Sequence, residues 1–288
     1  MKPRILQLLV FVLLVGTWGS AEALEPLKLY DNFEQTPIDI NRWVGVQFEA
    51  PFRFGTSFLE LVRKTTPEEH HLRILNRSFG LTFSNGVPPG NSLSLFRLGF
   101  TRPDTITAIR SRVKVRNVES RGCPVEVNST PTSVNAQIFG FFFNTVGPGS
   151  DGTNDVIAGL GVRRDSDSGA SPDVLEIVYF VDHCLDFNCV NSSNLAFGSL
   201  GTVTKGEWVR LLLQWDKEQH RFIFQRDIQL PAIFSYGDKI TDTAEPGIQS
   251  KTIGAHNGIA NCNSFSPRPV GMVDALFDNV FVNESAQP

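Results

Sequence analysis

The stretch that decides the fold runs from residue 208 to residue 226. It reads Trp208-Val-Arg-Leu-Leu-Leu-Gln-Trp-Asp216, then Lys217-Glu-Gln219, then His220-Arg-Phe-Ile-Phe-Gln-Arg226. From Val209 to Trp215 every second residue is apolar, so these side chains share one face of an extended chain. Such alternation is typical of a β-strand with one buried face. Three polar residues separate the two segments, so the stretch predicts an antiparallel β-hairpin.

Period-two segments bounded by Gly, Pro, Asn and Asp recur along the chain, whereas helical periodicity is almost absent. Further strands are predicted at residues 57–63, 71–76, 80–84, 92–98, 106–118, 136–144, 155–163, 174–181 and 270–282. This many short strands favour a sandwich of two antiparallel sheets. No linker or repeat divides them, so we expect one domain over residues 24–288.

Two segments depart from simple alternation. The run Ile138–Phe143 is apolar on both faces, which predicts a central strand that is buried on both sides or lines the floor of a cleft. Residues 238–268 lack periodicity and are rich in Gly, Asn and Pro, which predicts a long loop.

Three segments resemble the concanavalin-A-like lectin and glucanase superfamily. Leu29-Tyr-Asp-Asn-Phe-Glu-Gln-Thr-Pro-Ile-Asp-Ile-Asn-Arg-Trp43 is similar to its first strand, and residues 206–216 followed by Phe222-Ile-Phe224 are similar to its paired strands near the C-terminal end. Residues 275–282 resemble its closing strand. The resemblance implies an all-β jelly-roll sandwich with one concave sheet that carries the glycan-binding face.

The N-terminus has the pattern of a secretory signal peptide. Lys2 and Arg4 precede an apolar run from Ile5 to Val15, and small residues lead to Ala21-Glu-Ala23. The apolar run is too short to span a bilayer. We therefore expect residues 1–23 to be removed and the mature protein to be secreted, into the extracellular space or the periplasm, without a membrane anchor.

The 288 residues carry a formal net charge of −4, and the sequence pI is about 5.8. A general nucleic-acid binder would need a basic footprint, so this class of partner is not expected.

Four cysteines, an even number, predict two disulfides in an exported chain. Three pairings are possible. Four residues separate Cys184 from Cys189, which suits a small stapled loop and leaves Cys123 to pair with Cys262. The alternative is a zinc site at His183, Cys184 and Cys189, but a fourth ligand at the usual spacing is missing.

The sequence contains no catalytic pattern. A glycosidase needs two carboxylates close to one bond, and the glucanases that the chain resembles carry them as Glu-x-Asp-x-x-Glu on one strand. The nearest match here is Glu176 with Asp182, six residues apart, which is too far along a strand to act on one bond. We therefore predict no catalytic residue. The alternative is a divergent polysaccharide hydrolase or lyase whose acid and base lie on different strands.

The strand predicted at residues 106–118 is strongly basic on one face. Arg110, Arg112, Lys114 and Arg116 occupy alternate positions, so all four cations point the same way. One interpretation is a solvated face paired with acidic residues of adjacent strands. The functional interpretation is a basic groove that binds an anionic polysaccharide, because the guanidinium donors match carboxylate and sulfate groups.

Many domains of the superfamily hold a structural calcium ion, and the resemblance implies one here. Asp278 matches the aspartate of the closing strand that supplies a ligand. The backbone carbonyls near Asn32 and His70 match the other ligands, and calcium prefers oxygen ligands of this kind. The competing interpretation is that Asp278 forms a salt bridge.

Together these patterns predict a secreted, disulfide-stapled β-sandwich that binds a polysaccharide or glycan, with no catalysis. An exported adhesion or structural module with a protein partner is a further alternative.

Overall fold

The computed structural model describes residues 25–35, 38–45, 57–65, 70–83, 90–263 and 267–287, with only the backbone of 57–65, Phe83 and Asp238. The predicted signal peptide, residues 1–23, lies outside this part of the chain. None of the helices within the described residues is long and apolar enough to cross a membrane.

Eight strands form sheet A, in the order β14-β13-β12-β7-β17-β4-β3 with β1 beside β17. They are β1 (Leu27–Asp31), β3 (Ser57–Thr65), β4 (Leu72–Phe79), β7 (Ala108–Arg121), β12 (Val209–Asp216), β13 (Arg221–Arg226), β14 (Ala232–Ser235) and β17 (Val270–Asn283). Every pairing within this sheet is antiparallel.

Seven strands form sheet B, in the order β11-β10-β9-β8-β15-β6-β2, and they are also antiparallel. They are β2 (Trp43–Val44), β6 (Asn91–Phe100), β8 (Ser133–Asn144), β9 (Asp155–Asp165), β10 (Val174–Cys184), β11 (Ser192–Thr204) and β15 (Lys251–Ala260). The remaining elements are the parallel pair β5 (Thr82–Phe83) and β16 (Cys262–Asn263), and the short 3-10 helices η1 (Pro103–Thr105), η2 (Gly237–Lys239) and η3 (Glu284–Ala286).

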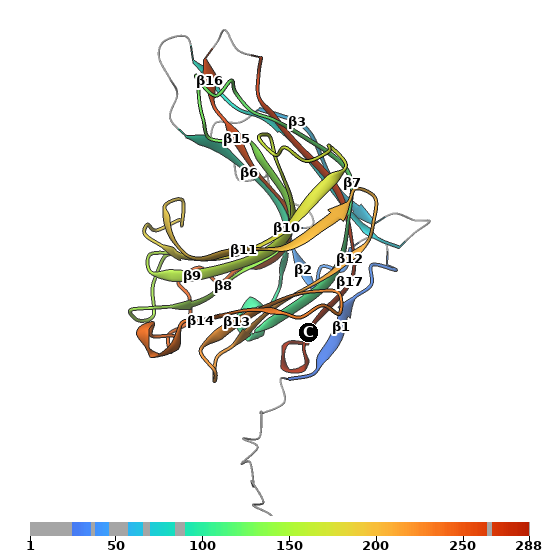
Figure 1. Ribbon diagram of the computed structural model, residues 1–288. Coiled ribbons are helices and arrows are strands. Elements are labelled where there is room, and N and C mark those ends of the chain that lie inside the picture. Colours follow the sequence, from blue (N-terminus) through green and yellow to red (C-terminus); the bar gives the residue numbers. More distant parts are fainter. Residues whose placement is uncertain are drawn as a thin grey trace, which may run out of the picture.

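The two sheets pack face to face, and sheet B curves so that β6 and β15 rise away from the level of β8, β9 and β11 (Figure 1). One hydrophobic core fills the space between them. The predicted all-β, antiparallel, two-sheet jelly-roll sandwich is therefore confirmed.

The β-hairpin predicted over residues 208–226 forms from β12 and β13. In β12 the side chains of Val209, Leu211 and Leu213 are buried in the core. Strand β13 pairs with it, with Trp215 opposite Phe222. The alternation is explained by burial, since only one face of sheet A contacts sheet B.

The doubly apolar run in β8 meets both predictions made for it. Ile138 and Phe143 belong to the core between the sheets. Phe139 and Phe141 lie on the opposite face of sheet B, in a second apolar cluster that includes Ile157 of β9. The strand thus separates the core from a surface on the outer side of sheet B.

The prediction of a long loop at residues 238–268 is wrong over residues 251–260. These residues form β15, which lies in the middle of sheet B between β8 and β6. Its small and polar residues have structural reasons. The backbone of Gly254 passes Phe96 so closely that a Cβ atom would lie 2.5 Å from the Phe96 carbonyl oxygen. Asn257 is fully buried and donates to the carbonyl oxygens of Asn76 and Gly271.

The structure contains both predicted disulfides, Cys123–Cys262 and Cys184–Cys189. The first joins the segment after β7 to β16, and the second closes a small loop after β10. No free cysteine occurs among the residues described.

Candidate functional site

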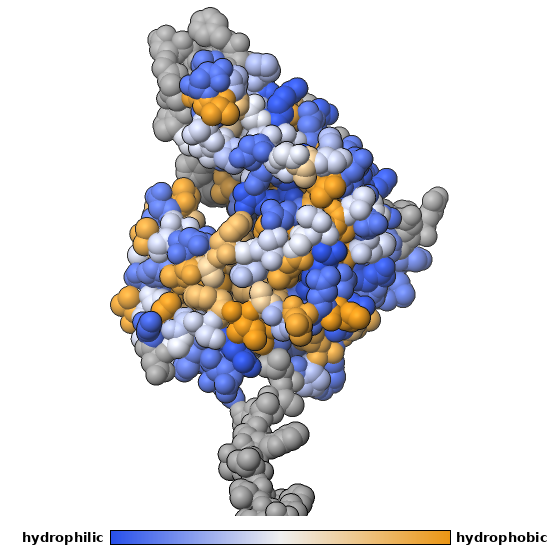
Figure 2. Space-filling model, in the orientation of Figure 1, coloured by the Kyte–Doolittle hydropathy of each residue, from blue (hydrophilic) through white to orange (hydrophobic). Residues whose placement is uncertain are grey.

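A groove of about 400 Å³ lies on the outer, concave face of sheet B. Side chains from β6, β8, β9, β10, β11 and β15 line it, together with the loop that the Cys184–Cys189 disulfide closes. In the space-filling view the molecule is notched between the part that carries β6 and β15 and the lobe that carries β9 and β11 (Figure 2). Phe139, Phe141 and Ile157 form an apolar part of its lining.

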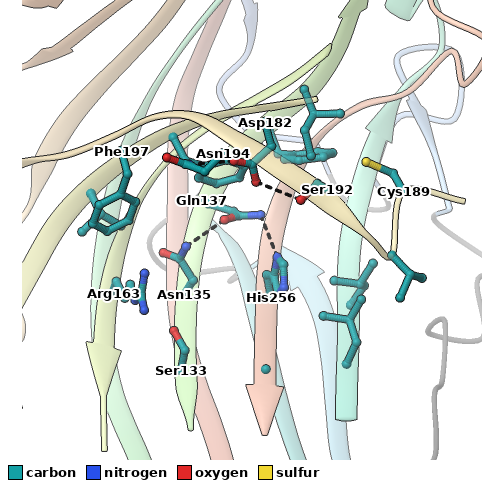
Figure 3. Close-up of a pocket in the computed structure, with 18 of the residues that line it drawn as sticks. Ser133, Asn135, Gln137, Arg163, Asp182, Cys189, Ser192, Asn194, Phe197 and His256 are labelled. Carbon is teal, nitrogen blue, oxygen red and sulfur yellow. Dashed lines mark hydrogen bonds between the residues drawn. The ribbon is translucent and has the colours of Figure 1, made fainter. Parts of the chain in front are cut away.

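Polar side chains form a row across the centre of the groove. Arg163 of β9 pairs with Asn135 of β8, and Asn135 pairs with His256 of β15, so the three residues lie on one rung of the sheet. Asn135 Nδ2 donates a hydrogen bond of 2.8 Å to Gln137 Oε1, and Gln137 Nε2 lies 3.3 Å from His256 Nδ1 (Figure 3). Because the Gln137 oxygen already accepts, its amide nitrogen donates to His256, and the proton of the neutral imidazole is placed on Nε2.

Glycine on β9 makes room for this row. A Cβ atom at Gly161 would lie 2.5 Å from Asn135 Oδ1 and 2.6 Å from Gln137 Cβ. The same strand carries Gly159, where a Cβ atom would lie 2.4 Å from the ring of Phe180. Side chains of β8 and β10 can therefore lie over β9, and the glycines keep the floor of the groove open.

His256 is uncharged at neutral pH. Burial, together with the positive charges of Arg97 and Arg163, lowers the pKa of His256 to about 3. The imidazole in this position is a hydrogen-bonding group with one donor and one acceptor, and the acceptor already has Gln137 as its partner.

Both arginines of the groove lie against aromatic rings. The guanidinium carbon of Arg97 is 4.4 Å from the ring centroid of Phe139, and that of Arg163 is 5.7 Å from the centroid of Phe197. Arg163 Nε also donates a 2.7 Å hydrogen bond to Asp165 Oδ1. Stacking holds a guanidinium group by its face and leaves donors at its edge for other partners.

Asp182 is the single carboxylate among the described residues that line the groove. Asn194 Nδ2 donates to its Oδ1 over 2.8 Å, and Ser192 Oγ lies 3.4 Å from its Oδ2. Burial raises the pKa of Asp182, while the hydrogen bonds from Asn194 and Ser192 oppose this effect. Strand β11, which carries Ser192, Asn194 and Phe197, crosses over this end of the groove (Figure 3).

The predicted ligand-binding row does not lie in this groove. Arg110, Arg112, Lys114 and Arg116 are on β7 of sheet A, and their side chains point away from the core, on the opposite side of the sandwich. Arg112 forms an ion pair of 3.3 Å with Asp278. Anion binding by these residues stays a prediction, but it cannot involve the concave face.

The predicted calcium residues lie around the interior strand β17 of sheet A: Asn32 follows β1 and His70 precedes β4, and both of these strands pair with β17 close to Asp278. Asp278 is almost fully buried, and its carboxylate accepts from Arg112 and from Asn279 Nδ2, with His71 Nδ1 3.8 Å away. The described residues include no group of three or more His, Cys, Asp or Glu side chains that could hold a metal ion. A calcium ion at Asp278 would have to displace these nitrogen partners, and calcium binding there stays a prediction.

Sequence reasoning missed the residues that line the groove. Asn135 and Gln137 continue the period-two face of Phe139 and Phe141, so the prediction of a cleft floor at Ile138–Phe143 was the available signal. His256 lay in the segment predicted as a loop, where no periodicity pointed to a shared rung.

No protein-family model matches the chain, and no curated protein matches it. Among solved structures, the catalytic domain of an endo-1,3-β-glucanase (laminarinase) from Thermotoga petrophila is 12% identical with a TM-score of 0.40, covering 91% of this chain and 100% of that one. A glycoside hydrolase family protein from Mycobacterium thermorestibile is 12% identical with a TM-score of 0.39, covering 90% and 99%. Lectin II from Ulex europaeus is 12% identical with a TM-score of 0.28, covering 83% and 95%. At these values the likeness assigns no activity to this chain.

Proposed function

We propose that the concave groove of sheet B binds a carbohydrate that carries carboxylate or sulfate groups, and that it does so without catalysis. The observation that carries this proposal is the row of Arg163, Asn135, Gln137 and His256 on neighbouring strands of one groove. Amides and a neutral imidazole offer fixed hydrogen-bond partners for hydroxyl groups, and the aromatic lining offers apolar surface for the faces of sugar rings.

The positive charge of the groove favours an anionic ligand. Arg97, Arg163 and one carboxylate, Asp182, line it, and Asp165, which pairs with Arg163, lies outside the lining. Burial raises the pKa of Asp182, so the charged form of this carboxylate is disfavoured in the groove. Arg97 and Arg163 are held by Phe139 and Phe197, so little conformational freedom is lost when a ligand binds. Forked guanidinium donors suit planar carboxylates and sulfates.

Two features favour binding over catalysis. A glycosidase needs a pair of carboxylates, and Asp182 is alone among the described lining residues. A general base is most effective when its pKa is near the working pH, and His256, with a pKa of about 3, is a weak proton acceptor. The ligand would be met outside the cytoplasm, because the predicted signal peptide and the two disulfides suit an oxidising compartment.

The test measures binding of a polyuronate, a sulfated glycan and a neutral glucan by calorimetry at two salt concentrations. We expect the anionic ligands to bind and the affinity to fall with salt, since exposed charges are screened over about 10 Å at 0.1 M. Arg163→Gln should weaken binding by about tenfold or more, which is the loss of one charge-assisted hydrogen bond. Arg121→Gln, which removes an exposed arginine at the end of β7 on the opposite sheet, is the matched control and should change nothing.

Equal affinity of the wild type and Arg163→Gln would reject the groove as the binding site. Assays for reducing ends and for unsaturated products should remain negative with each polymer. A positive signal that disappears in His256→Gln would instead establish the hydrolase or lyase alternative.

A further inference from the structure

We propose a second, separate anion site on the outer face of sheet A, which binds one sulfate, carboxylate or similar oxyanion group between Arg110, Arg112 and Arg210. These residues, with Asn279 and Phe281, line a depression of about 300 Å³. The sandwich lies between this depression and the concave groove, so the site does not depend on the function proposed for the groove.

The register of β7 with β12 concentrates positive charge at this point. Arg112 of β7 lies directly opposite Arg210 of β12. Arg110 precedes Arg112 by two residues, so the two side chains lie on the same face of β7. Like charges directly opposite each other in a sheet destabilise it unless another group offsets them. Proximity to Arg210 adds to the effect of burial in lowering the pKa of Arg110, so the two cations repel each other.

Carboxylates of the chain offset only part of this charge. Arg112 pairs with Asp278 over 3.3 Å. Among the residues that the structure describes, neither Arg110 nor Arg210 forms an ion pair. The Asp227 carboxylate accepts a hydrogen bond from the backbone N–H of Arg210 and forms an ion pair with Arg226.

Aromatic rings fix two of the guanidinium groups in place. The guanidinium carbon of Arg110 lies 4.0 Å from the ring centroid of Phe281, and that of Arg112 lies 4.6 Å from the centroid of Trp208. A stacked guanidinium keeps its edge N–H groups available as donors in the plane of the fork. The donors are therefore oriented before any ligand arrives, which lowers the entropic cost of binding.

A β-bulge in β17 opens the depression. The pairing of β17 with β7 shifts between Asp278, opposite Arg112, and Phe281, opposite Arg110. Asn279, within the bulge, has a φ of 48°, in the left-handed region that few residues other than glycine adopt. Bulges that redirect side chains are common next to binding sites, and this one places Asn279 and Phe281 around the three arginines.

The test follows the arginine Nε–H signals by nuclear magnetic resonance during titration with sodium sulfate, against sodium chloride at matched ionic strength. We expect the signals to shift saturably with sodium sulfate and not with sodium chloride. Arg210→Gln, whose guanidinium group forms none of the ion pairs above, should fold normally and weaken the sulfate affinity by about tenfold. Arg121→Gln, which removes an exposed arginine at the end of β7, outside the lining of the depression, should leave the affinity unchanged.

Shifts that grow linearly with sulfate, or an affinity that falls equally in Arg210→Gln and Arg121→Gln, would mean charge screening and would overturn the proposal. A second arm compares inorganic sulfate with a sulfated disaccharide, each on the wild type and on Arg210→Gln. Tighter binding of the disaccharide identifies a glycan as the source of the oxyanion, whereas equal binding identifies the free ion. Arg163→Gln should keep the sulfate response, which separates failure of this site from failure of the groove.

Discussion

The amide nitrogen of Gln137 lies 3.3 Å from Nδ1 of His256, which joins two neighbouring strands of sheet B at the centre of the concave groove. The relationship defines the imidazole as an acceptor toward Gln137, which requires it to be unprotonated at Nδ1. The lowered pKa of His256 is consistent with this geometry, since protonation would turn an acceptor into a donor facing another donor.

Replacing His256 should flatten the pH dependence of stability in acid. The folded pKa is about 3, below the ordinary value near 6.5, so between these values the unfolded chain binds the extra proton. The free energy of unfolding therefore falls as the pH drops from 6.5 towards 3, by at most about 1.4 kcal/mol per pH unit. In His256→Gln this contribution is absent, and urea denaturation from pH 4 to 7 should show a shallower slope. Identical slopes in the two proteins would contradict the prediction.

Lys251 should make the stability of the protein depend on pH in the alkaline range. Its side chain is buried, lies 5.0 Å from the ring centroid of Phe142 and donates over 2.7 Å to the Pro103 carbonyl oxygen. Burial lowers the pKa of Lys251 to about 7, although the Asp104 carboxylate acts in the other direction. Between pH 7 and 10.5 the unfolded chain holds the extra proton, so stability rises with pH.

Lys251→Met removes this titration. Relative to the variant, the wild type should gain up to about 1.4 kcal/mol per pH unit over that range. Denaturation of both proteins at pH 7, 8 and 9 measures the difference, in which the titration of other groups cancels. A constant difference across the three pH values would show that Lys251 stays charged in the folded protein.

The two disulfides should differ in what they contribute to stability. The sequence separation is 139 for Cys123–Cys262 and 5 for Cys184–Cys189. Loop-closure entropy predicts about 5 kcal/mol for the first and about 2 kcal/mol for the second. Double serine variants of each pair, compared by urea unfolding, should rank in this order. A larger loss on removing the short loop would mean that this loop does more than constrain the unfolded chain.

Calcium binding at Asp278 makes a prediction that involves its ion-pair partner. A cation at this carboxylate competes with Arg112, so Arg112→Gln should increase the rise in melting temperature that calcium produces, and chelator should reverse it. Asp278→Asn should abolish the response in both backgrounds. A melting temperature that neither calcium nor chelator changes, in the wild type and in Arg112→Gln, would reject the site.

The sequence predicted much of the fold because alternation is a local property. Burial of one face imposes period two on β12 and β13, and the double apolarity of Ile138–Phe143 reports two buried surfaces on one strand. The N-terminal motif also has a local reason to be recognisable. Trp43 is buried and its Nε1 donates to Asp31 Oδ2 over 2.6 Å, which ties the two ends of the motif together.

Strand β15 was not predicted because its residue types are explained by contacts with residues that are distant in the sequence. Position 254 requires glycine because the Phe96 backbone lies too close for a side chain. The Asn257 side chain donates to backbone carbonyl groups in β4 and β17, which explains a polar residue at a buried position. Without β15 in place, nothing in the sequence could join His256 to Asn135 and Arg163. The groove depends on the register of β9, β8 and β15. Strands β8 and β9 are consecutive in the chain, but the pairing of β8 with β15 places Asn135 opposite His256, 256 − 135 = 121 residues later.

The basic residues of β7 separate what the sequence determines from what the tertiary structure determines. By itself the sequence determined that Arg110, Arg112, Lys114 and Arg116 share one face, because side chains alternate along any extended chain. Only the tertiary structure decided which face this is: the outer side of sheet A, with Arg210 brought beside Arg112 by the pairing of β7 with β12. Alternation fixes which residues lie together on a strand, but the position of that strand and the curvature of its sheet come from contacts with all the other strands.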